Sequence, residues 1–336
     1  MDHQRQVLRM GAAAILFAIF LRLAGGGFFN SVIRLTENPA VMSFLVYLQT
    51  GRAVRYPQNN LYVPQRETTP PTIPEQTLPQ QQEQSLPVFS QSDLQGLSLT
   101  YGCGYRPDIE GLFYAPLHWD LTEDGPAVLI VHTHATEGYE KQPWEDYVEE
   151  YAYRTLDDRY NMVSIGDEVA RVLEAGGVGV IHDRSYHDYP SYNGSYGNAR
   201  MSIEDYLRQY PSIRMVLDIH RDASDGSDGT QLVTVGTVGG QRSAQLMVVV
   251  GTDATGNYHP NWQQNLSLAL KLTAVLEQEN PGVTRPVNLR GERFNMDMTP
   301  GSLLIEVGGA GNTHEEALLA ANALARGILA LAKGTV

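Results

Sequence analysis

The sequence VLIVHTHATEGYE at residues 128–140 places two histidines and two acids directly after a short apolar run. A nearly continuous apolar run of this length is typical of a strand that is buried on both faces. The polar residues would then stand at the end of that strand. His134 and Glu137 are close enough in sequence for one turn of chain to present both to one ion. The stretch predicts either half of a metal site or a polar loop.

Similar apolar runs recur along the chain and alternate with segments of helical periodicity. The predicted strands cover residues 127–132, 178–182, 214–220, 244–251 and 302–308. One predicted helix starts near Met162 and stops at Gly176, and another begins at Thr313 with Glu316 at capping-box spacing. This alternation predicts an α/β fold with a mostly parallel twisted sheet and helices on both faces. Residues 231–240 look like a hairpin instead.

The N-terminus predicts a membrane anchor. Residues 10–29 are largely apolar and long enough to span a bilayer as a helix, and Arg5 and Arg9 precede them. With these arginines on the cytoplasmic side, the rest of a single-pass chain lies outside the cytoplasm, at the cell membrane. A cleaved signal peptide and a buried globular helix are the alternatives.

A spacer follows the predicted anchor. Residues 56–87 are rich in Pro and Gln and poor in core-forming residues, which is typical of a disordered linker. We therefore predict three parts: an anchor and juxtamembrane region at 1–55, a linker at 56–96 and a catalytic domain at 97–336.

Composition narrows the function. The formal net charge is -14 and the basic residues are scattered, which argues against a nucleic-acid partner. Cys103 is the single cysteine, so a disulfide framework and a multi-cysteine zinc cluster are excluded. Any metal must therefore be held by His, Asp or Glu.

Three strand ends carry residues that suit a hydrolytic zinc site. Ligands bind beyond the carboxyl ends of parallel strands, and a catalytic zinc often takes two His and one Glu. His134, Glu137 and His220 fit that ligand set, provided that their strands are neighbours. Glu306 lies inside an apolar run, where a buried carboxylate is rare unless it is paired, ligating or catalytic, and it fits the general base.

Several assignments stay open at this stage. His132 competes with His134 for the metal, and His182 and His187 raise a second metal option in a segment that also suits a mobile surface loop. Arg221 is a candidate catalytic residue that binds a substrate carboxylate or an oxyanion. Its alternative is an ion pair with Asp218 or Asp222.

Three motifs in this order resemble one known family. HTHATEGY, DIHRDA and LLIEVGGAGNTHEEA, behind an apolar N-terminus and a polar spacer, resemble the stage II sporulation protein P family, which is related to zinc-dependent N-acetylmuramoyl-L-alanine amidases. The resemblance covers residues 97–333. It implies Zn²⁺ held by His134, Glu137 and His220, and Glu306 as the catalytic carboxylate.

The same resemblance implies a substrate and partners. The substrate is peptidoglycan, cut at the amide between muramic acid and the stem peptide, with endopeptidase activity on cross-links in addition. The partners are the sporulation proteins D and M, at the septum and the engulfing membrane. A catalytically silent wall-binding scaffold and a zinc carboxypeptidase on free peptides are the alternatives.

Overall fold

The computed structural model describes residues 86–335, apart from 151–152 and 224–229. All of these residues belong to one compact unit, Thr72–Val336. The predicted anchor region, 1–55, lies outside the described residues, as does most of the predicted linker. None of the helices in the described ranges combines the length and apolar character needed to cross a membrane.

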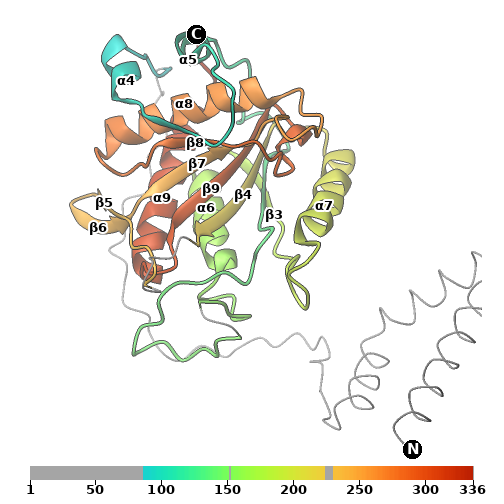
Figure 1. Cartoon of the computed structure of the whole chain (residues 1–336), viewed down its shortest axis with the longest axis vertical. Coiled ribbons are helices and arrows are strands. Elements are labelled where there is room, and N and C mark those ends of the chain that lie inside the picture. The colour runs from blue at the N-terminus through green and yellow to red at the C-terminus, as the bar shows by residue number, and fades with distance from the viewer. Residues whose placement is uncertain (1–85, 151–152, 224–229, 336) are drawn as a thin grey trace, which may run out of the picture. The chain divides into compact units, whose positions relative to one another are not determined.

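The described chain alternates strands and helices (Figure 1). The strands are β1 (Leu99–Tyr101), β2 (Pro126–Val131), β3 (Gly179–His182), β4 (Met215–Asp222), β5 (Val235–Val238), β6 (Gln241–Ala244), β7 (Leu246–Val250), β8 (Val287–Leu289) and β9 (Gly301–Gly309). The helices are α4 (Gln91–Gly96), α5 (Ile109–Tyr114), α6 (Met162–Ala175), α7 (Ser195–Gln209), α8 (Trp262–Glu279) and α9 (His314–Ala330), with a short 3₁₀ helix η1 (Met296–Met298).

Seven strands form one sheet in the order β1-β8-β7-β9-β4-β2-β3. Every neighbouring pair is parallel except β7 and β9, so the prediction of an α/β fold with a mostly parallel sheet is confirmed. The sheet is nevertheless mixed. A parallel return needs a crossover, usually a helix, but β5 and β6 pair as a hairpin between β4 and β7, and the chain re-enters the sheet in the opposite direction.

The predicted hairpin is confirmed, with its turn at the end of the predicted range. Gly239 and Gly240 connect β5 to β6, and their φ angles are +57° and +79°. A two-residue hairpin turn with both residues at positive φ suits the twist of the strands, and glycine adopts it at little cost.

The helices cover both faces of the sheet. Buried residues of α6, α8 and α9 pack with those of β2, β4, β7 and β9 in the larger core cluster. Ile203 of α7 packs with Leu129 and Val131 on the other face. Figure 1 shows α7 apart from α6 and α9, beside β3 and β4. The two predicted helix ends are confirmed: Gly176 caps α6, and Thr313 and Glu316 form a capping box on α9.

The folded body begins before residue 97. Helix α4 lies within the segment predicted as linker, and Ser90 and Asp93 form a capping box at its start. Phe89 and Leu94 pack against the larger core cluster. The six-residue helix is too short to give a periodic signal in the sequence, and the three-residue strands β1 and β8 escaped prediction for the same reason.

A buried lysine lies between α8 and the N-terminal part of the body. Lys271 is 1% exposed, and its Nζ donates to the Leu112 carbonyl oxygen at 3.0 Å and to Ser267 Oγ at 2.8 Å. Burial lowers the pKa of Lys271 to about 8. The Ser267 hydroxyl also donates to the Leu112 oxygen, at 2.7 Å. The Leu112 oxygen therefore keeps a partner when the lysine is removed.

We predict that Lys271→Met stabilises the protein at pH 7. An unfolded lysine titrates near 10.4, so between pH 8 and 10.4 the unfolded chain binds more protons and stability rises with pH. Burial of the charged lysine therefore lowers the free energy of unfolding by its full amount below pH 8 and by almost nothing near pH 10.5. The difference in free energy of unfolding between the variant and the parent protein should fall by up to about 3 kcal/mol over this range. Denaturant unfolding at several pH values measures it, with the exposed Lys333→Met as control. A pH-independent difference would contradict the prediction.

Candidate active site

The predicted site residues meet at one edge of the sheet. Strands β2, β4 and β9 are adjacent and parallel, so their carboxyl ends lie together. His220 of β4 and Glu306 of β9 are register partners, and partners in neighbouring strands point to the same face. His134 and Glu137 lie in the loop that follows β2, the long green segment in Figure 1. The predicted ligand set required the strands before these residues to be neighbours, and β2 and β4 are neighbours in the sheet.

Five side chains form what we call the acid–histidine cluster: His134, Glu137, Asp218, His220 and Glu306. The Oε2 atom of Glu137 lies 3.5 Å from Nδ1 of His220. The imidazole rings of His134 and His220 are 5.3 Å apart and nearly perpendicular. Asp218 Oδ1 lies 2.9 Å from His220 Nε2, although the two do not make a well-directed hydrogen bond. The four residues predicted from sequence thus converge, and Asp218 joins them.

Three polar atoms of this cluster are buried without a hydrogen-bond partner. They are His134 Nδ1, His220 Nε2 and Glu306 Oε2. Buried polar atoms are normally satisfied, and an exception points to strain, a catalytic role or a missing water or ion. Two imidazoles and a carboxylate are also the donor types that zinc takes. The donor types therefore fit zinc, although the unpartnered carboxylate oxygen belongs to Glu306 and not to Glu137, the predicted third ligand.

The side chains are not spaced as in a closed metal site. Within the described residues, no group of three or more His, Cys, Asp or Glu side chains has an arrangement that could hold an ion. Glu137 instead accepts hydrogen bonds from Nη2 of Arg154 at 3.1 Å and from the backbone N–H of Arg221 at 3.3 Å. Zinc ligation thus stays a prediction that the convergence of the residues supports.

The charges inside the cluster are strongly coupled. Burial alone would lower the pKa of His220, but the carboxylates of Asp218 and Glu137 outweigh it and raise that pKa well above its usual range. Burial would raise the pKa of Glu137, but nearby His220 and Arg221 lower it to about 2. Burial lowers the pKa of His134. In the absence of a metal, a proton on His220 balances the acids that surround it.

Glu306 differs from the other acids of the cluster. Burial raises its pKa to about 8; nearby His220 works against this, and the carboxylates of Glu137 and Asp222 add to it. A carboxyl group that holds its proton at neutral pH, yet faces a cationic ring, is poised to give or take a proton.

Two tyrosines flank the cluster. The Tyr192 ring stacks on the His134 ring with centroids 4.4 Å apart and planes within 7°, and Tyr192 is 57% exposed. Tyr196, near the start of α7, lies almost parallel to His220 at 6.5 Å. These rings restrict the orientation of both histidines and make one wall of the site partly apolar.

Arg221 makes hydrogen bonds to the backbone of the loop that follows β2. Its Nε donates to the Gly138 carbonyl oxygen at 3.0 Å, and its Nη2 donates to the Tyr153 carbonyl oxygen at 3.2 Å. Arg221 is buried, and its Nη1 lies 3.9 Å from Oε1 of Glu137. Of the acids named in the alternative, Asp218 lies beside His220 and Asp222 pairs with Arg285 at 2.7 Å. Arg221 braces the loop after β2, so a direct contact with substrate stays a prediction that these hydrogen bonds do not support.

The other three histidines named in the sequence analysis, His132, His182 and His187, make contacts of their own. His132 Nδ1 lies 3.0 Å from the Ile219 carbonyl oxygen, and its Nε2 lies 2.8 Å from Nε2 of His182. His182 also contacts Asp167 at 3.0 Å, whereas His187 contacts Asp183 at 3.2 Å. His182 and His187 therefore have separate partners, which gives no support to the second metal option, and both ring nitrogens of His132 are engaged.

Two contributors to the site escaped the sequence analysis. Arg154 contacts Glu137, and Asp188 lies 3.9 Å from His134 Nδ1. Both residues lie outside helices and strands, where no periodicity marks a buried side chain. The only available signal for Asp188 was its position beside His187 in a segment already flagged for metal binding.

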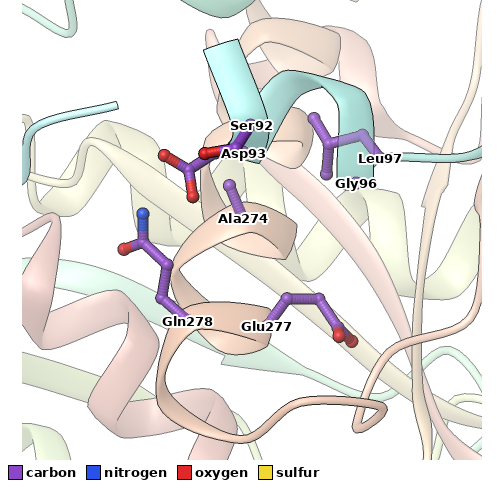
Figure 2. A pocket seen from close by; sticks show the side chains of 7 residues that line it. All are labelled: Ser92, Asp93, Gly96, Leu97, Ala274, Glu277 and Gln278. Carbon is purple, nitrogen blue, oxygen red and sulfur yellow. The ribbon is translucent and has the colours of Figure 1, made fainter. Parts of the chain in front are cut away.

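A small pocket lies elsewhere, between α4 and α8. Figure 2 shows the side chains that line it: Ser92, Asp93, Gly96, Leu97, Ala274, Glu277 and Gln278. None of these belongs to the acid–histidine cluster, and among the described residues that line the pocket no histidine is present. The chemistry-bearing groups therefore mark the candidate site at the β9–β4–β2 edge.

The fold and the cluster define an α/β protein with a buried acid–histidine site at the carboxyl end of its central strands. The chain belongs to the stage II sporulation protein P family, whose model matches residues 54–329. It is 29% identical over 215 residues to stage II sporulation protein P of Bacillus subtilis strain 168, which is 61% of this chain. The matched region is 50% of that relative, so the chain spans about half the length of the curated relative it matches.

One solved structure that the chain matches in part is the N-acetylmuramoyl-L-alanine amidase from Clostridium difficile 630. The two share 14% sequence identity with a TM-score of 0.37, and the similarity covers 62% of this chain and 97% of that one.

We predict that Glu306→Gln stabilises the metal-free protein at alkaline pH. Because the folded chain holds the Glu306 proton up to about pH 8, whereas an ordinary glutamate loses it near 4.5, stability falls as pH rises between these values. The variant should match the parent protein at pH 4.5 and exceed it by up to about 5 kcal/mol above pH 8. Denaturant unfolding with a chelator present measures this difference. Equal stabilities at both pH values would show that Glu306 is not held protonated.

Proposed function

We propose that this chain is a zinc-dependent peptidoglycan hydrolase that cleaves the amide between N-acetylmuramic acid and L-alanine. The observation that carries the proposal is the convergence of His134, Glu137, His220 and Glu306, with three buried nitrogen or oxygen atoms left unpartnered. Membership of the sporulation family supports cell wall as the substrate. Endopeptidase activity on stem-peptide cross-links is a further part of the proposal.

His134, Glu137 and His220 would hold the zinc ion. When bound, zinc lowers the pKa of water toward 7 and polarises a substrate carbonyl. Loss of the His220 proton would accompany binding, because a ligating imidazole must present a lone pair. Asp218, next to His220, then favours a ring oriented toward the cation.

Glu306 would move the proton during hydrolysis. Its carboxyl group sits beside His220 and has one oxygen without a partner. A cation in the cluster favours the ionised form, which can accept a proton from the attacking water. The same group can then return that proton to the departing amine of the stem peptide. Glu306 is half-buried, so one side of its side chain stays open to solvent.

The cellular setting is also proposed. Residues 1–55 would anchor the chain in the cell membrane, with the body outside the cytoplasm at the sporulation septum and engulfing membrane. The predicted linker would give the body reach into the wall. Sporulation proteins D and M would be its partners.

One prediction of the proposed function concerns metal content. We expect one zinc ion per chain after purification without chelator, and its loss from His134→Ala and His220→Ala, because each removes a ligand. Elemental analysis by mass spectrometry measures the stoichiometry. The exposed His118→Ala is the control and should retain zinc. Loss of zinc from His182→Ala but not from His134→Ala would favour the second metal option instead.

Another prediction of the proposed function concerns the reaction. The full chain should release stem peptides from purified peptidoglycan, with the new amine on L-alanine, and chelation should stop it until Zn²⁺ is restored. Glu306→Gln should lower the rate by a factor on the order of 10²–10⁴, the range for a lost general acid–base. Mass spectrometry of the products reports bond and metal dependence together. The exposed Glu110→Gln, on α5, is the control.

Each alternative has a distinct product pattern in that experiment. Release of one terminal amino acid from free peptides would indicate a carboxypeptidase. Wall binding without any new product, equal in the parent chain and Glu306→Gln, would indicate a scaffold and contradict the proposed function.

A further inference from the structure

Arg154 joins two buried acids around the acid–histidine cluster. Its Nη2 donates to Oε1 of Glu137 at 3.1 Å, and its Nη1 donates to Oδ2 of Asp188 at 2.9 Å. Nη1 also donates to the hydroxyl of Thr136 at 2.8 Å. The Arg154 side chain is 19% exposed and both carboxylates are nearly inaccessible, so these are partly buried ionic hydrogen bonds and not surface pairs. Such contacts are short and directional.

Asp188 lies between Arg154 and His134. Its side chain is fully buried, and the Thr136 hydroxyl donates to its Oδ2 at 2.6 Å. The same Oδ2 lies 3.9 Å from Nδ1 of His134, which has no hydrogen-bond partner. Arg154 and Asp188 together therefore connect the surroundings of two predicted ligands, Glu137 and His134.

The geometry at Glu137 separates its two oxygens. Oε1 faces Arg154, whereas Oε2 faces Nδ1 of His220 at 3.5 Å and the backbone N–H of Arg221 at 3.3 Å. The guanidinium thus holds the outer oxygen and leaves the inner oxygen directed toward the centre of the cluster. Ligating carboxylates in proteins are commonly held in this way by a further hydrogen bond.

Tyr192 ties the same arginine to His134 from the exposed side. The Arg154 guanidinium carbon lies 5.2 Å from the centroid of the Tyr192 ring, and that ring stacks on His134. A cation at this distance from an aromatic face is attracted to it. The side chain that orients Glu137 therefore also supports the ring that packs against His134.

We propose that Arg154 and Asp188 form an outer clamp that positions Glu137 and His134 for a divalent cation. The inference rests on the proposed zinc site and deepens it. Both clamp members are positioning residues, since they act through the ligands and do not touch the ion or the substrate. The planar guanidinium is essential because it bridges Glu137 and Asp188 at the same time. A lysine ammonium is a point charge and would pair with only one of these acids.

The test is zinc affinity, measured by competition with a chromophoric chelator, on the full chain. Arg154→Gln should weaken zinc binding by about 10–100-fold, the usual effect of removing a partner of a ligand. Arg154→Lys should weaken it as well, because charge alone does not restore the bridge. Asp188→Asn keeps the side-chain size and should show a comparable loss. Arg159→Gln is the matched control, because Arg159 lies in the same loop but pairs with Asp146 and Asp157.

A second readout separates positioning from catalysis. At saturating zinc, hydrolysis by the Arg154 and Asp188 variants should return to within a few-fold of the parent chain, because the clamp acts through metal affinity. Circular dichroism of the metal-free variants reports whether each has folded. If Arg154→Gln does not fold, Arg154→Lys and Asp188→Asn decide the outcome.

Three results would overturn the clamp while leaving the proposed function intact. They are unchanged zinc affinity in all clamp variants, tighter binding by Arg154→Gln, and a raised KM with unchanged affinity. The second would mean that Arg154 competes with the cation for Glu137, and the third that Arg154 binds substrate. A parent chain that takes up no zinc would overturn the proposed metal site and the clamp together.

Discussion

The parallel pairing of β4 with β9 is the constraint on which the site depends. It places His220 beside Glu306 in register, and the pairing of β2 with β4 brings the loop after β2 to the same edge. A slip of one residue between β4 and β9 would turn Glu306 to the opposite face of the sheet. The register is secured by apolar residues buried on both faces of these strands, so the stability of the core and the geometry of the cluster have a common origin.

The ionised acids of the buried site are balanced by an equal number of cationic groups. Glu137, Asp188 and Asp218 are all nearly inaccessible, and Arg154, Arg221 and a protonated His220 provide the nearest positive charge. Buried charges persist in proteins only when they are paired or bind a metal. Glu306 remains without a cationic partner at hydrogen-bond distance and keeps its proton instead. A divalent cation held by these residues would replace the proton on His220 as a balancing charge.

His132 and His134, which are two residues apart after β2, have different roles. The Ile219 carbonyl oxygen can only accept, so Nδ1 of His132 must donate to it and Nε2 must accept from His182. Gly166 of α6 makes room for this pair, since a Cβ there would come within 2.6 Å of His132 Nε2. His132 thus anchors the end of β2 from one face, while His134, two residues later, is free to join the cluster.

The sequence alone determined the alternation of buried strands and amphipathic helices, because burial on one or both faces leaves a period in the order of apolar residues. It also indicated His134, Glu137, His220 and Glu306, since polar side chains at strand ends stand out against apolar runs. Only the tertiary structure decided that β7 runs antiparallel, that Arg221 braces a loop, and that Arg154 and Asp188 flank the cluster. These features depend on strand order and on contacts between loops that are distant in sequence, and such contacts leave no local pattern for a sequence to display.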